Sequence, residues 1–438
     1  MRERKKESNE IKIKFINHAC FQFFINDYSF LIDPWFFGKV FNNSWSLFKD
    51  TNIDNLDIES VRYIFISHEH PDHLHFETLK KIKNINPNIT IIFPYRKDKT
   101  VKNVIEKIGF KFKFIEQNNE KFFIDKLNYV KYFSFEKEGD HTMVFKINDK
   151  IIVNQNDDYT LNKAIKLILD EFQTIDVLMT QFSLAGYYGN AEEAEKIKKN
   201  GHDFHINRVI EYAKKFNPKI VVPFASYVYF CKDTNKYLNN FIVQPEEIFH
   251  ALKKINEKNK CQLVYYEDEI IFNNDYEERN KINLNKLNIL FKTTDLQILQ
   301  SKKIKEEDLI DAVNNRLKSI SLLKLLTTFI DYKKPISSLI KSLIKLIILS
   351  NKNLIIHITD INKIFELNFL KKNFHIKEYN KNIVCDLSLP SEDFLFMFKF
   401  PWGSDTVNIS ATANIYTKKG LLLFSFFQSI YKKFGIQV

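Results

Sequence analysis

Four histidines, one glutamate and one aspartate fall within the segment YIFISHEHPDHLHF at positions 63–76. The whole chain of 438 residues holds only 11 histidines, so this segment concentrates them strongly. Its centre, His68 to His73, spells H-x-H-x-D-H and directly follows VRYIFIS (61–67), which reads as a buried strand. The loop after such a strand lies at a sheet edge, where ligands commonly bind in layered α/β proteins.

The spacing of these residues points to metal binding. His68 and His70 are two positions apart, so in an extended chain their side chains point the same way. Pro71 then restricts the backbone ahead of Asp72 and His73. Protonated histidines at this density would repel one another, whereas a bound cation keeps them neutral and makes the cluster favourable. A polar surface loop is the alternative, and the preceding strand with a helical pattern after it favours the metal site.

Composition excludes several classes of protein. Hydrophobic residues make up 45% and charged residues 27%, which is typical of a globular chain long enough for two or three domains. The net charge of +11 is spread along the chain as lysine with no compact arginine patch, so no nucleic-acid partner is predicted. The four cysteines form no CxxC pair, which argues against a zinc ribbon and favours a reduced, cytoplasmic setting.

No stable membrane insertion is predicted. The N-terminus MRERKKESNE is charged and lacks the apolar core of a signal peptide. The apolar runs at 343–349 and 421–427 are far shorter than the roughly 20 residues that span a bilayer. We expect the surrounding segments, 336–349 and 420–433, to be buried core helices, with a helix on the membrane surface as the alternative.

The order of the expected elements indicates an α/β fold. Strand patterns dominate the first part of the chain and then alternate with helices up to about residue 266, as in sheets covered by helices. The composition turns rich in Asn, Lys and Glu around residue 275. We therefore expect a catalytic domain over 1–275, a helical linker region over 276–350 and a small α+β C-terminal domain over 351–438.

The H-x-H-x-D-H motif, with LIDPW (31–35) before it and GDHTMVF and IIVNQNDD after it, resembles the metallo-β-lactamase superfamily over about residues 10–270. The resemblance implies an αββα sandwich and a site for two divalent ions, zinc or else iron or manganese. It assigns His68 and His70 to one ion, and Asp72 and His73 to the other.

Further residues follow from the same resemblance. His141 in GDHTMVF is the expected third ligand of the first ion, and Asp157 the carboxylate that bridges both ions, with Asp158 as its alternative. Asp33, at the end of LIDPW, is expected to orient a ligand. Asp72 and Asp157 are also the expected catalytic residues, because a carboxylate beside the ions can orient a water molecule.

One position departs from the superfamily pattern. A late strand usually precedes a last histidine of the second ion, but here it reads IVVPFASYVYFC (220–231) and contains none. Ser226 and Tyr227 occupy the neighbourhood and are poor ligands. His18, in NHA (17–19), matches an early histidine of the branch that includes L-ascorbate-6-phosphate lactonase, which would place it near the site.

The segments VNQNDD, LMTQFSLAGYY and VVPFASYVYFC are similar to the hydrolase-like domain of the CMP-N-acetylneuraminate hydroxylase family. Members of that family often carry a Rieske domain, whose paired Cys and His motifs do not occur in this sequence. An oxygenase would therefore need electrons from a separate redox partner.

Three functions remain open at the level of sequence. The first is metal-dependent hydrolysis of an ester, phosphoester or lactone, in which the ions lower the pKa of bound water to about 7, with sugar or cell-surface glycan metabolism as a setting. The second is a di-iron oxygenase acting on a nucleotide-activated sugar, and the third is a non-catalytic metal-binding scaffold. The substrate is expected to be a small molecule, and its pocket is expected to include Trp35, Trp45, Tyr187, Tyr188 and Arg208. The sequence does not give the oligomeric state.

Overall fold

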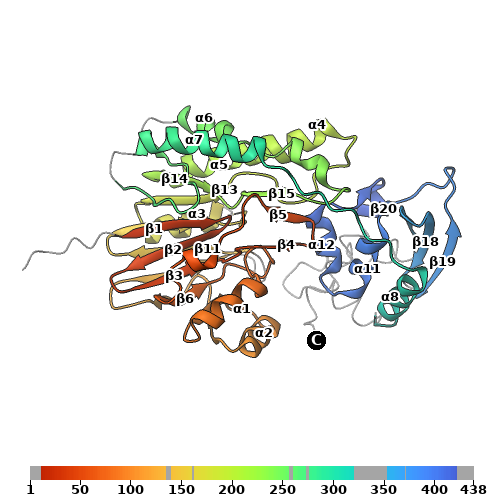
Figure 1. Cartoon of the computed structure of the whole chain (residues 1–438), viewed down its shortest axis with the longest axis horizontal. Coiled ribbons are helices and arrows are strands. Elements are labelled where there is room, and N and C mark those ends of the chain that lie inside the picture. Colours follow the sequence, from red (N-terminus) through yellow and green to blue (C-terminus); the bar gives the residue numbers. More distant parts are fainter. Residues whose placement is uncertain are drawn as a thin grey trace, which may run out of the picture.

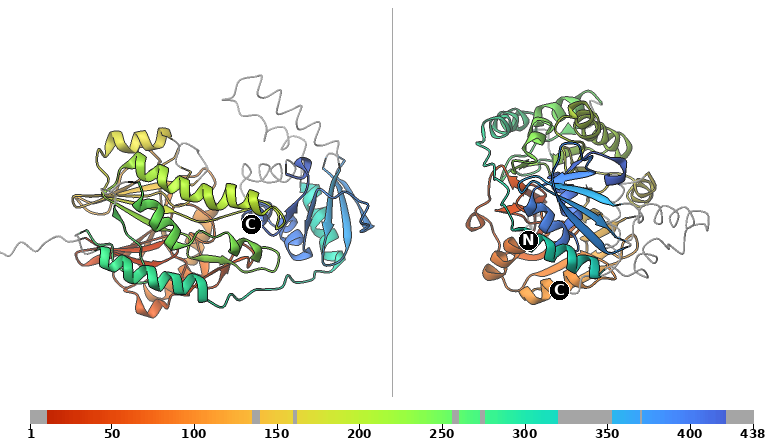
Figure 2. Two further views of the ribbon diagram at one scale, coloured as in Figure 1. Left: turned by 90° about the horizontal axis from the view of Figure 1, so that it is seen from above. Right: turned by 90° about the vertical axis from the view of Figure 1, so that its right-hand side faces the viewer.

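Two sheets stacked face to face form the larger part of the molecule, with helices on both outer faces (Figure 1). The computed structural model describes residues 11–134, 140–159, 162–255, 260–272, 276–319, 353–369 and 371–421. A second body, made of helices and a smaller sheet, lies beside one end of the two sheets (Figure 2). The predicted αββα sandwich with an appended α+β region is confirmed.

The first sheet has the order β1-β2-β3-β6-β7-β8. β1 to β3 pair antiparallel, whereas β3, β6, β7 and β8 run parallel. The outer face is covered by α1 (Phe76–Ile85) and α2 (Thr100–Ile108). The strands are Lys12–Asn17, Cys20–Ile25, Tyr28–Ile32, Val61–Phe65, Thr90–Pro94 and Lys111–Ile115.

The second sheet has the order β16-β14-β13-β12-β11-β10-β9, with β12, β13, β14 and β16 parallel. In chain order from β9 to β14 its strands are Phe122–Phe123, Tyr129–Phe133, Thr142–Ile147, Lys150–Asn154, Val177–Gln181 and Ile220–Phe224, and β16 is Lys260–Cys261. Its helices are α3 (Asn162–Glu171), α4 (Ala194–Ile197), α5 (Asp203–Phe216) and α6 (Pro245–Lys253), with the π-helical turn η2 (Lys198–His202) joining α4 to α5.

Aromatic rings fill the space between the two sheets. Phe23 and Phe30 of the first sheet stack on Phe145 of the second, with ring centroids 5.3 and 5.5 Å apart. Phe65 meets Phe145 edge to face at 5.5 Å. Phe65 ends β6, the strand that leads into the histidine cluster. The tightly packed core therefore fixes the direction in which that cluster leaves the sheet.

A small third sheet, β15-β5-β4, lies at the end of the sandwich that faces the second body. Its strands are Lys39–Val40, Trp45–Leu47 and Val228–Phe230. The loop between the first two has three consecutive residues with positive φ, Phe41 (50°), Asn42 (56°) and Asn43 (58°). Asparagine tolerates this conformation, but for phenylalanine it is strained, and such strain is typical of functional regions.

The C-terminal body has its own core. A five-stranded sheet of order β19-β18-β17-β20-β21 packs against α8 (Glu306–Ser319), α11 (Ser391–Lys399) and α12 (Gly403–Ser410). Its strands are, in chain order, Leu354–Ile358, Lys363–Asn368, Asn373–Glu378, Leu387–Leu389 and Asn414–Ile415. The segment VNISATANIY (407–416) has a strand-like pattern but is divided: Val407–Ser410 end helix α12, where Val407 is buried in the core, and only Asn414–Ile415 join the sheet as β21.

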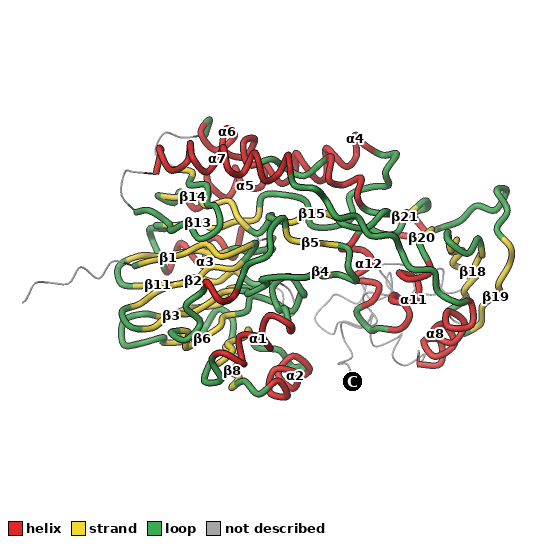
Figure 3. Tube along the Cα trace, in the orientation of Figure 1, coloured by secondary structure: helices red, strands yellow, loops and turns green. Residues whose placement is uncertain are grey.

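The helix α7 (Tyr276–Thr293) belongs with the first core, where Leu287 and Phe291 are buried. A long loop then leads from α7 to α8 (Figure 3). The predicted division at 275 and 350 stays a prediction, and the packing of α7 favours a first boundary after Thr293. Segment 336–349 and residues 422–433 lie outside the described residues. In the part of the chain that the structure describes, no helix combines the length and apolarity needed to cross a bilayer.

Candidate metal centre

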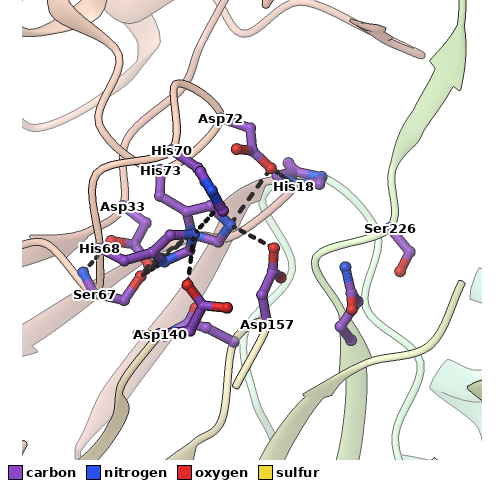
Figure 4. A network of polar contacts seen from close by, with 12 residues as sticks. His18, Asp33, Ser67, His68, His70, Asp72, His73, Asp140, Asp157 and Ser226 are labelled. Carbon is purple, nitrogen blue, oxygen red and sulfur yellow. Dashed lines mark hydrogen bonds and ion pairs between the residues drawn. The ribbon is translucent and has the colours of Figure 1, made fainter. Parts of the chain in front are cut away.

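Several loops at one edge of the sandwich bring the candidate ligands together (Figure 4). Asp33 directly follows β3, and the histidine cluster follows β6, its parallel neighbour in the first sheet. Asp157 follows β12 of the second sheet. The ends of strands from both sheets therefore meet at this edge, as the sequence motifs predict for parallel strands.

Asp33 fixes the base of the cluster. It is fully buried, its φ is 43°, and its carboxylate accepts hydrogen bonds from the backbone N–H and the hydroxyl of Ser67 at 2.8 and 2.7 Å. The same carboxylate lies 3.0 Å from Nδ1 of His73. A carboxylate on Nδ1 leaves Nε2 free of a proton, which is the arrangement of a histidine that binds a metal.

The first group of donors combines His68, His70 and Asp140. Nε2 of His68 lies 2.8 Å from Nδ1 of His70 and 3.7 Å from the carboxylate of Asp140. Suitable ligand atoms of all three residues lie within 4.8 Å of one another. Two imidazole nitrogens bound to one ion are about 3.3 Å apart when each bond is about 2.1 Å. The separation of the two nitrogens is therefore compatible with one shared ion.

The second group is centred on His73. Its Nε2 lies 3.4 Å from Asp72 Oδ2 and 3.5 Å from Asp157 Oδ2. His18, in the turn between β1 and β2, places Nε2 3.3 Å from the same oxygen of Asp72. His18, Asp72 and His73 form one set of three donors within 4.8 Å, and Asp157 forms another with His68 and His73. Asp157 therefore lies between the two groups, whereas Asp158 accepts a hydrogen bond from Thr142.

Unsatisfied polar atoms show that these donors fit a cation. Four buried atoms in this small volume have no hydrogen-bond partner: Nδ1 of His18, Oδ1 of Asp72, Nε2 of His73 and Oδ1 of Asp157. Buried polar atoms are almost always paired in folded proteins, and several exceptions at one place indicate a missing ion or water. The set of imidazoles and carboxylates matches the ligands of zinc, iron and manganese.

The charges around the cluster reinforce this fit. Burial lowers the pKa of His68 well below its ordinary value, with His73 adding to the effect, so this imidazole is neutral. Burial alone would also lower the pKa of His73, but Asp72, Asp157 and Asp33 raise it far above the ordinary value. In turn, burial would raise the pKa of Asp72, yet His73 and His18 hold it well below its usual range. The carboxylates therefore stabilise positive charge at the second group.

His141, the expected third ligand of the first ion, is buried but belongs to none of the donor groups found among the described residues. Its Nε2 lies 3.1 Å from the amide nitrogen of Gln117. Burial lowers the pKa of His141 to about 3, and the positive charge of Arg96 adds to that shift. The carboxylate of the neighbouring Asp140 lies 3.7 Å from Nε2 of His68. Sequence reasoning missed Asp140 although both residues stand in the same motif, and the role of His141 as a ligand stays a prediction.

At the end of the late strand that lacks a histidine, the structure places Ser226. Ser226, which follows β14, uses its hydroxyl to accept hydrogen bonds from the backbone N–H groups of Phe182 and Ser183 at 3.1 and 3.0 Å. Its role is therefore to anchor the loop after β13. His18 approaches Asp72 and His73 from the other side of the cluster (Figure 4). A histidine from the turn between β1 and β2 is thus one of the donors of the second group.

One face of the cluster is open. The side chains of His70, Asp140 and Asp405 keep 26%, 30% and 23% of their surface exposed, whereas His68, Asp72 and His73 are almost completely buried. Asp405 belongs to α12 of the C-terminal body, and sequence reasoning missed it as well. Solvent or a substrate can reach the cluster from this side, between the two bodies of the molecule.

Arg208 lies beside the loop that carries Asp157. Its guanidinium donates hydrogen bonds to the backbone oxygen and the side-chain Oε1 of Gln181 at 3.3 and 2.8 Å, and it stacks over the ring of Tyr159 at 4.6 Å. Its Nε and Nη1 are buried and have no hydrogen-bond partner. Among the described residues, no carboxylate lies within 4.0 Å of this buried cation.

The other expected pocket residues take mostly structural positions. The indole of Trp35 is buried and meets His18 edge to face at 5.5 Å, next to the cluster. Trp45 packs between Phe41 and Phe230. The hydroxyl of Tyr188 lies 2.7 Å from Nε2 of the buried His205, and Tyr187 donates a hydrogen bond to Asn190.

Most of the larger body of the molecule matches a known family. The family model described as Beta-lactamase superfamily domain matches residues 12–225. Residues 12–225 are a β-lactamase superfamily domain. All loops that carry the candidate ligands lie within this domain, while Asp405 lies outside it.

Proteins with curated names are similar to part of the chain. The cytidine monophosphate-N-acetylneuraminic acid hydroxylase of Danio rerio is 23% identical over 272 residues, which cover 57% of this chain and 44% of that protein. The protein of the same name from Asterias rubens is 36% identical over 86 residues, 19% of this chain and 13% of the other. The aligned part thus spans less than half the length of these relatives.

Two solved structures are similar to part of the chain. CmlA, a diiron β-hydroxylase from Streptomyces venezuelae, is 14% identical with a TM-score of 0.41, covering 60% of this chain and 54% of its own. A metallo hydrolase from the archaeon Ignicoccus hospitalis is also 14% identical, with a TM-score of 0.43, and the match covers 59% and 97%.

Proposed function

We propose that this protein is a di-iron oxygenase that hydroxylates a small anionic substrate. The observation that carries the proposal is the composition of the two donor groups, each of which pairs two imidazoles with one carboxylate. The sets are His68, His70 and Asp140 for the first ion and His18, His73 and Asp72 for the second, with Asp157 between them. Two histidines and one carboxylate, with positions left open, are typical of non-haem iron sites that use oxygen.

The reaction fits an enzyme that depends on a partner. Bound iron would supply the activation of oxygen. One oxygen atom of O₂ enters a C–H bond of the substrate, and the other leaves as water after taking up two electrons and two protons. The electrons come from a separate reductase or ferredoxin-type protein, because the paired Cys and His motifs of a Rieske centre are absent from this sequence. The hydroxylase names of the relatives support this reading.

The chain's own residues prepare the site for this chemistry. Asp33 and Ser67 orient the imidazole of His73 and hold the base of the cluster rigid. The open face at His70 and Asp140 admits the substrate, while burial of His68 and Asp72 keeps water away from the inner side. Asp157, only partly buried, is placed to accept or return a proton near His73.

Hydrolysis is the second candidate. It is favoured by Asp72 and Asp157, whose carboxylates flank Nε2 of His73 and can orient a water molecule for attack on an ester or phosphoester.

The oxygenase and the hydrolase can be told apart by the metal and by the need for oxygen. Two irons per chain, with oxygen consumption that depends on ascorbate as electron donor, would support the oxygenase. Zinc or manganese, with turnover of nitrophenyl esters or phosphodiesters in air-free buffer, would support hydrolysis. Tight ion binding with neither activity would support the non-catalytic scaffold.

His18 offers a test of the second donor group. Replacing it in His18→Ala removes one of three ligands, so we expect one of two bound ions to be lost or bound at least tenfold more weakly. The ion content after dialysis against a chelator measures this effect. His250→Ala is the control, because His250 lies on the exposed side of α6 and outside the cluster. Retention of both ions in His18→Ala would exclude His18 as a ligand.

The substrate of the named relatives is a cytidine monophosphate sugar, and Arg208 suits such an anion. A buried guanidinium without a carboxylate is costly, and a phosphate or carboxylate of the substrate would satisfy it. We expect Arg208→Met to raise the KM for an anionic substrate by about tenfold or more with kcat changed less. Steady-state kinetics test this, with the exposed Arg62→Met as control. An unchanged KM would remove Arg208 from the substrate site.

A further inference from the structure

The open side of the metal centre is closed partly by a residue of the C-terminal body. Oδ2 of Asp405 lies 3.7 Å from Nε2 of His70, while Nδ1 of His70 faces His68. The two nitrogens of one ring thus point to different partners. A histidine that binds a metal through one nitrogen usually presents its other N–H to a carboxylate, which fixes the tautomer and the orientation of the ring.

The position of Asp405 is rigidly determined. At Gly403, where α12 begins, an added Cβ would overlap the backbone oxygen of Phe396 in α11. The two helices are therefore in direct backbone contact, and α12 cannot shift without α11. Asp405 stands in the first turn of α12. The position of its carboxylate therefore depends on where α11 packs against the larger body.

α11 is docked by a buried ion pair between the two bodies. Nζ of Lys232 lies 2.8 Å from Asp393 and 3.1 Å from Glu392, and the side chains of Lys232 and Asp393 are 1% and 0% exposed. Nearby, the amide of Asn235 donates hydrogen bonds to the backbone oxygens of Ser44 and Ser410 at 3.1 and 2.8 Å. Buried charges require well-defined geometry, so this contact specifies one relative position of the two bodies.

The loop that carries Phe41 and Asn42 also connects Asp393 with His70. The amide of Asn42 donates a 2.7 Å hydrogen bond to Asp393. Its neighbour Phe41 places its ring edge to face with His70, at a centroid distance of 5.9 Å. Both residues belong to the loop of consecutive positive φ angles. The strained loop and α12 therefore hold His70 from two sides, and both are fixed by Asp393.

We propose that docking of the C-terminal body completes the metal centre, with Asp405 as the positioning residue that orients His70 for the first ion. The inference rests on the metal site proposed above and is independent of which reaction that site catalyses. On this proposal, the C-terminal body contributes a residue that positions a metal ligand at the open side of the site. A chain in which this contact is loosened should bind one ion poorly although all ligands are intact.

Cobalt(II) titration of the full chain tests the proposal, because the visible spectrum of cobalt reports each filled site and its geometry. In Asp405→Ala we expect the dissociation constant of one ion to rise about 10- to 100-fold while the other stays unchanged. Asp405→Asn keeps a hydrogen-bond acceptor. Its dissociation constant for that ion should lie between the values of Asp405→Ala and the wild type. Asp311→Asn, an exposed change on α8 of the same body, is the control and should bind both ions normally.

A second variant covers the case in which Asp405→Ala does not fold. Asn42→Gly keeps the backbone conformation accessible and removes only the amide contact to Asp393. Asn42→Gly should also raise the dissociation constant of the ion that Asp405→Ala affects. Wild-type binding of both ions in Asp405→Ala and Asn42→Gly would overturn the inference and leave the proposed function untouched. Two ions without any oxygen-dependent turnover in the wild type would overturn the function and leave this inference standing.

Discussion

His68→Ala combined with His70→Ala is expected to abolish activity and to remove the first ion. Both imidazoles of the first donor group are lost, and Asp140 alone offers too few ligands to hold an ion there. Loss of a single supporting residue weakens metal binding by about 10- to 100-fold, so loss of two direct ligands should exceed a hundredfold. Elemental analysis after gel filtration measures the loss of the ion, and ascorbate-dependent oxygen consumption measures the loss of activity.

The matched control for this double variant is His202→Ala with His250→Ala. These histidines lie on the helical surface, where His202 contacts Glu247 and Asp203, and neither belongs to the cluster. We expect normal ion content and activity in the control. Unchanged ion content and activity in the variant that lacks His68 and His70 would show that the assignment of the site is wrong.

Lys232→Met is expected to destabilise the protein by about 3 kcal/mol or more, because it leaves the buried Asp393 without its cation. Burial already raises the pKa of Asp393, and the nearby Lys232 and Asn42 oppose that shift. The free energy of unfolding from urea titration, together with the rate of proteolysis in the loop between α7 and α8, measures the loss.

Lys292→Met provides the control for this change, because Lys292 makes only a surface ion pair with Glu246 at 3.7 Å. Such exposed pairs contribute less than about 1 kcal/mol. The change of both partners, Lys232→Met with Asp393→Leu, should recover much of the lost stability, since no buried charge then remains unpaired. Equal stability of Lys232→Met and wild type would mean that the two bodies are held together by other contacts.

Local signals in the sequence predicted the fold and indicated which inner residues of the candidate site lie close together. The apolar run before His68 predicts a buried strand, and the structure ends β6 at Phe65. The motif LIDPW places Asp33 at the end of a neighbouring parallel strand, where it contacts Ser67 and His73. These residues lie on loops fixed by strand ends, so their proximity follows from the topology alone.

The outer part of the site could not be predicted in the same way. Asp140 and His141 are neighbours, and only the path of the chain into β11 decides which side chain faces His68. His18 approaches the cluster because β1 and β2 form a hairpin at that edge. Asp405 is 335 positions away from His70, and its approach depends on how two cores dock. Contacts of this kind depend on tertiary packing and leave no periodic signal.

In the C-terminal body, too, tertiary packing decides features that the local sequence pattern does not predict. VNISATANIY alternates like a strand, yet its first four residues, Val407–Ser410, end helix α12, and only Asn414–Ile415 form a strand. The residues that bring α12 to the metal centre, Lys232 and Asp393, carry ordinary charges in the sequence. Their importance arises only from burial in the contact between the two bodies.

The number and identity of the ions in untagged, freshly purified protein test the central claim most directly. The two donor groups predict two ions per chain, and the proposed oxygenase function predicts that both are iron when the cells are supplied with it. Elemental analysis together with Mössbauer spectroscopy of ⁵⁷Fe-grown protein gives both values. A chain that holds no ion, even after anaerobic incubation with iron(II), would contradict the account.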